Sequence, residues 1–145
     1  MKKNYNIFLA IFLLCCFHTA SSQECVQPGS LVTVFHPISD SSEYIVFKFL
    51  KPYHSKGTLT PYNGDLFAPL TKGKTFYRIT FTNVVNYCYD KLNRIKPGNK
   101  MTGFKTETKN GGTVSYVFEL AEGIKIANHF AYNYHNSWFV KIKIQ

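Results

Sequence analysis

Residues 70–82 begin with a polar turn that contains Gly73, and apolar and polar residues alternate after this turn. The alternation would place Tyr77, Ile79 and Phe81 on one face and Arg78, Thr80 and Thr82 on the other. A period of two is typical of a half-buried β-strand. A strand with one apolar face needs a second apolar layer to cover it, so the pattern predicts a sandwich or a barrel.

The same pattern recurs along the chain. Further strands are expected at residues 30–36, 43–50, 58–60, 101–108, 113–120, 124–127 and 138–144. In the last of these the alternation points Trp138, Val140, Ile142 and Ile144 inward and Phe139, Lys141 and Lys143 outward. Asn110 and Gly111 can take the positive φ angles of a tight hairpin. Prolines and glycines interrupt the apolar periodicity over residues 51–69, so this segment is expected to be a long loop region. About eight short strands and no helix after residue 22 predict an all-β fold, an antiparallel β-sandwich.

The N-terminus has the features of a secretory signal peptide. Lys2 and Lys3 precede an apolar run from residue 7 to 17, and small residues lead to a cut after Ser22. The run is shorter than the roughly 20 residues that span a bilayer, although an uncleaved anchor is the alternative. We therefore predict a signal peptide at residues 1–22, a single β-sandwich domain at residues 23–145, and a secreted, extracellular protein. No later apolar run is a transmembrane candidate.

Two of the four cysteines leave with the signal peptide, which leaves Cys25 and Cys88. In an oxidising compartment two thiols in one small domain most simply form a disulfide. Closing a loop of that length contributes roughly 4 kcal/mol in the chain-entropy model. The alternative, a catalytic or metal-binding cysteine, has no CxxC spacing to support it.

The chain is strongly basic. Removing Lys2 and Lys3, with no acid, lowers the formal net charge from +9 to +7. The positive residues are spread along the chain, which most simply indicates a solvated surface. The alternative is attraction to anionic glycans, lipids or cell surfaces. Nucleic acid is not an expected partner, because no arginine-rich or RNA-reading signature is present.

Catalytic motifs are missing from the sequence. There is no GxSxG serine elbow, no HExxH zinc motif, and no recognisable carboxylate pair for glycoside cleavage. The acidic residues fall mostly at expected turns or on polar strand faces. His129 and His135 are six residues apart, on or near an expected turn, and no ligand cluster accompanies them. The protein is therefore expected to be non-catalytic, with no cofactor and no metal site.

Aromatic residues make up 17% of the chain, and many lie outside the expected core positions. Rings with polar neighbours suit sugar recognition, because sugar C–H faces stack on rings while hydroxyl groups form directional hydrogen bonds. Two groups fit this pattern: one around Tyr53 to Asp65, and residues 128–138. The candidate ligand-binding residues are His54, Lys56, Tyr62, Asn63 and Asp65. The alternative is that these rings only close the ends of the sandwich.

Several segments resemble a galectin domain, in the same order along the chain. They are QPGSLVTVFHPISDSSEYIVFKFL, APLTKGKTFYRITF, FKTETKNGG with VSYVFE, IKIANHFAYNY and WFVKIKI. The resemblance implies a jelly-roll, galectin-like sandwich. The family's sugar-binding motif H-x-N-P-R is absent, since no Asn-Pro-Arg follows His54. Asn63 and Gly64 have no tryptophan after them, and the single tryptophan, Trp138, lies in the last strand. No family binding residue is carried over.

The sequence thus predicts a secreted, non-catalytic binding protein that is lectin-like, with an extracellular glycan or glycoprotein as its partner. One alternative is a basic interaction or defence protein that binds anionic surfaces. Another is a small lipid carrier with an aromatic-lined cavity. Salt distinguishes the first two, because attraction between exposed charges is screened over about 8 Å at physiological ionic strength.

Overall fold

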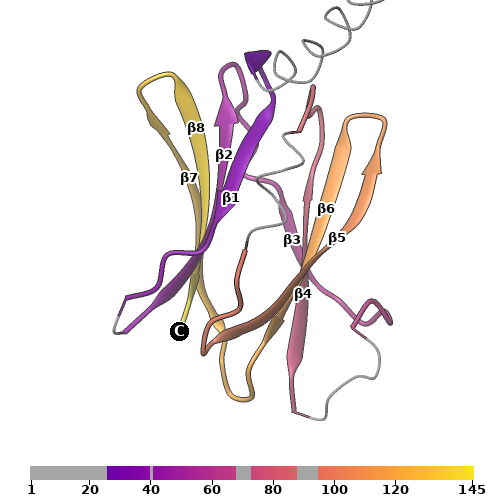
Figure 1. Cartoon of the computed structure of the whole chain (residues 1–145), viewed down its shortest axis with the longest axis vertical. Helices are drawn as coiled ribbons and strands as arrows, with labels where there is room; N and C mark the ends of the chain where they lie inside the picture. Colours follow the sequence, from indigo (N-terminus) through magenta and orange to yellow (C-terminus); the bar gives the residue numbers. More distant parts are fainter. Residues whose placement is uncertain (1–25, 40, 68–72, 88–94) are drawn as a thin grey trace, which may run out of the picture.

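The computed structural model describes residues 26–39, 41–67, 73–87 and 95–145. These residues form an all-β sandwich of two antiparallel, four-stranded sheets (Figure 1). The strands are β1 (Leu31–Phe35), β2 (Glu43–Leu50), β3 (Thr58–Pro61), β4 (Thr75–Phe81), β5 (Met101–Asn110), β6 (Thr113–Leu120), β7 (Ile126–Tyr134) and β8 (Ser137–Ile144). The first sheet has the order β1-β2-β8-β7, and the second sheet has the order β3-β4-β6-β5. The predicted fold class is confirmed.

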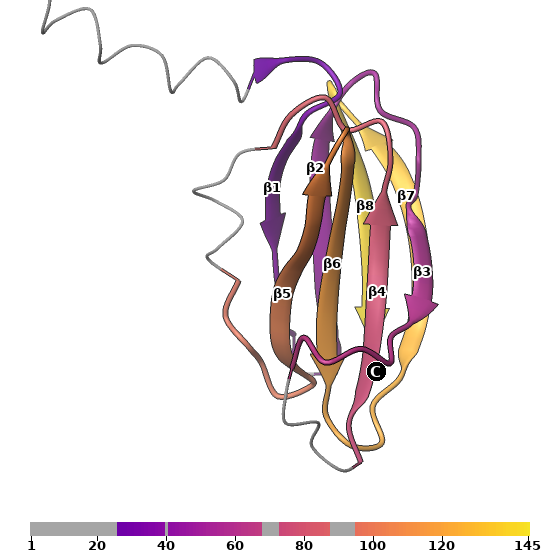
Figure 2. The same cartoon turned by 90° about the vertical axis from the view of Figure 1, so that its right-hand side faces the viewer.

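The core lies between the two sheets, whose broad faces oppose each other (Figure 2). Alternate residues of β2 and β8 pair across the first sheet, including Ile45 with Ile142 and Phe47 with Val140, and all four are fully buried. The second sheet contributes Phe81, whose ring centroid lies 4.8 Å from that of Phe47. The predicted inward positions of β4 and β8 are therefore correct, because the period-two pattern reports one buried face.

Two local predictions need correction. The hairpin between β5 and β6 forms as expected, but its positive φ angles fall on Gly111 and Gly112, while Asn110 pairs with Thr113 as the last residue of β5. The strand predicted at residues 124–127 is instead the nine-residue β7. Consequently His129 lies within a strand, and only His135 lies in the turn after it. β7 is the edge strand of the first sheet, so its alternation of apolar and polar residues is weak.

A buried carboxylate links the two sheets, and it is an exception to the expectation that the acids lie mostly at turns or on polar strand faces. Glu43, at the start of β2, is 2% exposed. It accepts hydrogen bonds from the backbone N–H groups of Lys100 and Met101 at 2.8 and 2.9 Å, and it lies 3.0 Å from Nε2 of His36. Burial alone would raise the pKa of this carboxyl, but these contacts outweigh burial and lower the pKa below its ordinary value.

Residues 1–22 and both cysteines of the predicted disulfide, Cys25 and Cys88, lie outside the described residues. The signal peptide and the disulfide stay predictions. Within the described part of the chain, no helix has the length and apolar character needed to cross a membrane.

Candidate functional site

The predicted ligand-binding residues divide between the two sheets. His54 and Lys56 are exposed and belong to the loop that crosses from β2 to β3. This loop is held against the first sheet, because Nε1 of Trp138 donates a hydrogen bond to the carbonyl oxygen of Ser55 at 2.8 Å. The His54 ring meets the Trp138 ring edge-on, with the centroids 5.7 Å apart. The Trp138 side chain therefore packs against the loop, and its ring is not an exposed surface on which a sugar could stack.

His129 also holds this loop. Its Nε2 lies 2.7 Å from the carbonyl oxygen of Lys56, and since a carbonyl only accepts, the ring nitrogen is the donor. Burial lowers the pKa of His129, which favours the neutral ring at pH 7. The nitrogen that would otherwise be offered to a ligand is therefore engaged with the backbone.

Tyr62 lies on the outer face of the second sheet. It is 8% exposed and packs in a small cluster with Phe76 and Val117. The Arg78 guanidinium lies over its ring, 4.8 Å from the centroid. The ring therefore covers the sheet, and its upper face is occupied by Arg78. Asn63 and Asp65 are exposed on the same segment.

Two cations of this second-sheet face are paired with acids, and a third, Lys105, donates a hydrogen bond to the carbonyl oxygen of Leu66 at 2.9 Å. Arg78 forms an ion pair with Glu107, and Lys74 forms one with Glu119. Burial would raise the pKa of Glu119, but hydrogen bonds from Lys74 and Thr102 lower it below the ordinary value, which favours the charged carboxylate. This face is covered by residues 62–67, and its cations are engaged by acids, by a carbonyl oxygen or by a ring, so it offers little to an anionic or sugar ligand.

The outer face of the first sheet is different, since it combines exposed rings with lysines. Strand alternation and register place these side chains on it, and we call eight of the rings and lysines the aromatic–lysine face. They are Phe35, Tyr44, Lys48, Phe130, Tyr132, Phe139, Lys141 and Lys143. Three of the rings form a row, with centroids 6.0 Å apart for Phe130–Tyr132 and 5.3 Å for Tyr132–Phe139. The interplanar angle in the second pair is 12°.

The rings of this face are accessible. Phe35, Phe130 and Tyr132 are 41%, 37% and 39% exposed. Beneath them Val46 is only 3% exposed, which shows that the side chains form a continuous layer over the sheet. Half-exposed, well-supported rings of this kind can stack on the C–H face of a sugar.

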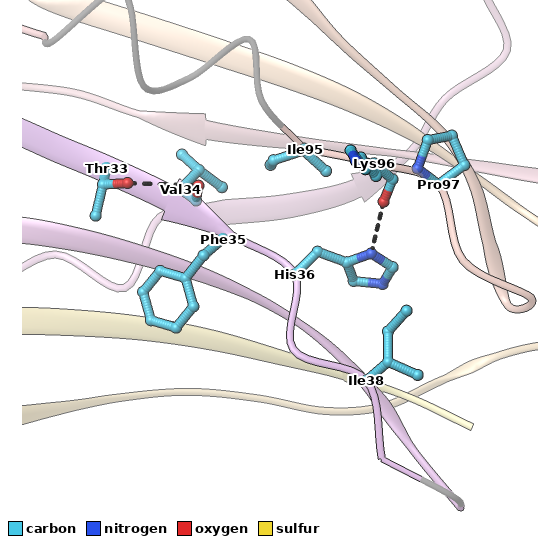
Figure 3. Close-up of a pocket in the computed structure, with 8 residues that line it drawn as sticks. All are labelled: Thr33, Val34, Phe35, His36, Ile38, Ile95, Lys96 and Pro97. Atoms are coloured by element: carbon cyan, nitrogen blue, oxygen red, sulfur yellow. Dashed lines mark hydrogen bonds between the residues drawn. The ribbon is translucent and has the colours of Figure 1, made fainter.

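A cavity of about 490 Å³ adjoins the edge of this face at β1 (Figure 3). Phe35 belongs to both the face and the cavity wall, and Ile38 and Ile95 supply further apolar lining. Lys96 lies on the far side, where its carbonyl oxygen is 2.9 Å from Nδ1 of His36. This hydrogen bond ties residues 95–97 to the end of β1.

The described residues contain no group of three or more His, Cys, Asp or Glu that could hold a metal ion. Comparison of the chain with family models, with characterised proteins and with solved structures found no significant match. The galectin resemblance accordingly rests on the sequence segments alone.

Part of the aromatic–lysine face was predicted from the sequence. Residues 128–138 were expected to form an aromatic group, and Phe139, Lys141 and Lys143 were expected to point outward. Their proximity to Tyr44, Lys48 and Phe35 was not predicted. The alternation in β2 does put Tyr44 and Lys48 on one side of the strand. Only the strand order β1-β2-β8-β7 shows that this side adjoins the outward side of β8, with β7 beyond it.

Proposed function

We propose that the protein is a secreted, non-catalytic carbohydrate-binding protein whose binding site is the aromatic–lysine face. The observation that carries this proposal is the row of rings formed by Phe130, Tyr132 and Phe139, which stack on one another at interplanar angles of 29° and 12°. Phe130 and Tyr132 are 37% and 39% exposed. Rings that hold one another in place on a sheet present their exposed surface with a small ordering cost on binding.

Polar groups beside the rings support a sugar ligand. The phenol group of Tyr132 supplies a hydroxyl, and Asn128 is exposed opposite Lys143 on the neighbouring strand. Sugar recognition needs directional hydrogen bonds around a stacked ring. The lysines add donors that can reach hydroxyl or acidic groups.

Secretion and the lack of catalysis are supported by the sequence. The basic, apolar and small-residue order of residues 1–22 matches a signal peptide. No catalytic motif occurs in the chain, and the buried Glu43 and Glu119 are both engaged in structural hydrogen bonds.

The lipid-carrier alternative has less support. The space between the sheets is filled by core side chains such as Phe47, Phe81 and Tyr116, whose rings contact one another. The cavity beside β1 is lined by residues of β1, by Ile38 and by residues 95–97 (Figure 3).

A glycan array probed with the protein tests the proposal. The protein is collected from the medium of cells that express the full chain, which also tests secretion. On the best glycan, Tyr132→Ala is expected to weaken binding about tenfold, or about 1.4 kcal/mol, through loss of the stacking ring. Tyr132→Phe keeps the ring and should retain most of the affinity.

Two loop variants serve as matched controls for the sequence-predicted site. His54→Ala and Asn63→Ala alter exposed residues away from the ring row, and both should bind as the wild type does. If these loop variants abolish binding while Tyr132→Ala is silent, the site lies in the loop and the proposed location is wrong. If the secreted protein binds no glycan, the carbohydrate function itself is wrong.

A further inference from the structure

The aromatic–lysine face carries positive charge that its own strands do not neutralise. Lys48, Lys141 and Lys143 project from β2 and β8 between the rings. The four strands of the first sheet contain one acid, Glu43, and its buried carboxylate is bonded to the start of β5. Of the ion pairs within the described residues, none includes these three lysines.

Cations and rings are neighbours across the sheet. Lys141 stands between Val46 of β2 and Phe130 of β7, and Lys48 stands beside Phe139. Lysines two residues apart on one strand project about 7 Å apart, and neighbouring strands lie about 5 Å apart. Each amine is therefore within reach of a ring-bound ligand.

Two amines are already positioned by rings. Nζ of Lys141 lies 4.0 Å from the centroid of Tyr44, and Nζ of Lys48 lies 5.9 Å from that of Phe139. A cation over a ring is restrained near the apolar surface. An acidic group on a stacked sugar would meet these amines without a large loss of side-chain freedom.

The site is longer than a single sugar. A path across the strands runs from Phe130 through Lys141 to Phe35, and it continues into the cavity beside β1. Lys96 lies at the far side of that cavity. Crossing four strands covers about 15 Å, which suits several residues of a chain and supplies a further cation at its end.

From these features we propose that the aromatic–lysine face binds an acidic polysaccharide, one that carries sulfate or carboxylate groups, along a path from β7 to β1. The proposal rests on the carbohydrate function above and names its ligand class. Charge complementarity favours an acidic chain over a neutral one. The rings lie on a sheet face rather than on a protruding loop, which favours a chain laid on the sheet over insertion into a lipid surface.

Calorimetric titration of the secreted protein with a sulfated octasaccharide prepared from heparin tests the proposal. Parallel titrations use cellohexaose as a neutral chain and vesicles of 30% phosphatidylserine in phosphatidylcholine. The sulfated chain is expected to bind most tightly, and its affinity should fall steeply between 0.05 and 0.5 M NaCl, because salt screens the lysines.

Two double variants distinguish the effect of the lysines on this face from the effect of the protein's total charge on binding. Lys48→Gln/Lys141→Gln should weaken binding of the sulfated chain about tenfold or more. The control, Lys56→Gln/Lys105→Gln, removes the same charge from the crossing loop and the second sheet, and it should change affinity less than about twofold, as expected for distant, screened charges. Thermal unfolding checks that both remain folded.

Each contrary result has a distinct meaning. Equal losses in the two double variants would overturn the assignment to this face. Salt-insensitive binding of cellohexaose, unchanged by the lysine variants, would overturn the acidic ligand while leaving the carbohydrate function intact. Binding to vesicles but to neither oligosaccharide would replace both proposals with a membrane surface, and no binding to any probe would refute both.

Discussion

The buried Glu43 carboxylate should be a main determinant of stability, because it joins the two sheets. Replacing it by alanine removes the acceptor for the N–H groups of Lys100 and Met101, and for the ring of His36. A buried donor without a partner costs about 1–3 kcal/mol, and Met101 is fully buried. Lys100 is only partly buried, so water can replace the acceptor of its N–H group at a lower cost. In total, we expect Glu43→Ala to lower the free energy of unfolding by about 3–5 kcal/mol.

Glu43→Gln is the more informative variant, because it preserves the shape of the side chain. One carboxylate oxygen accepts from Lys100, and the other accepts from Met101 and faces His36. Glutamine has a single acceptor oxygen, so its NH₂ group would face a donor. We expect a loss of about 2–3 kcal/mol at pH 7, which is a large part of the 5–15 kcal/mol typical of a domain.

Urea unfolding at several pH values provides the assay. The pKa of Glu43 is lowered in the folded protein, so its stabilisation is present above the unfolded pKa of about 4.3 and is lost as the pH falls through the lower folded value. The gap between wild type and Glu43→Gln should therefore close in acid. Glu122→Gln, at an exposed turn, should change stability by less than about 0.5 kcal/mol. A similar small effect for Glu43→Gln at pH 7, or a gap independent of pH, would refute the reasoning.

Three further variants test other contacts by urea unfolding. Tyr62→Ala should cost roughly 3 kcal/mol, because the ring is packed beneath Arg78; a loss below 1 kcal/mol would contradict a structural role. Gly57→Ala should destabilise by at least about 1 kcal/mol, since φ is +75° and a Cβ would lie 2.7 Å from the Phe81 ring; an unchanged midpoint would contradict this. Burial lowers the pKa of His129 in the folded protein, so the free energy of unfolding of the wild type should fall as the pH drops below about 6.5. His129→Gln should reduce this pH dependence, and an equal pH dependence in the two proteins would contradict the reasoning.

Much of the fold could be predicted from the sequence because buried faces repeat every second residue. The bounds of β2 are correct, and the inward and outward positions of β8 follow directly from its alternation. β7 was predicted too short because Asn128, His129 and Asn133 interrupt its apolar pattern. As an edge strand with a largely exposed surface, β7 depends on pairing with β8 rather than on its own composition.

The site could be predicted less well, since it depends on contacts between distant segments. Tyr62 was a reasonable sugar-binding candidate from its polar neighbours, yet residues 62–67 fold over Phe76 and Val117 and bury the ring. Glu43 has partners 57 and 58 positions away in the sequence, which no local pattern reveals. The aromatic–lysine face likewise combines four strands in an order that the chain does not follow.

The most direct test of the proposed site is to map a bound ligand by amide chemical shifts. The secreted protein, labelled with ¹⁵N, is titrated with the sulfated octasaccharide. We expect the largest shifts at Phe130 and Tyr132 of β7, Phe139 and Lys141 of β8, and Lys48 of β2, with little change in residues 54–65. Largest shifts within residues 54–65, or none on the first sheet, would contradict the account.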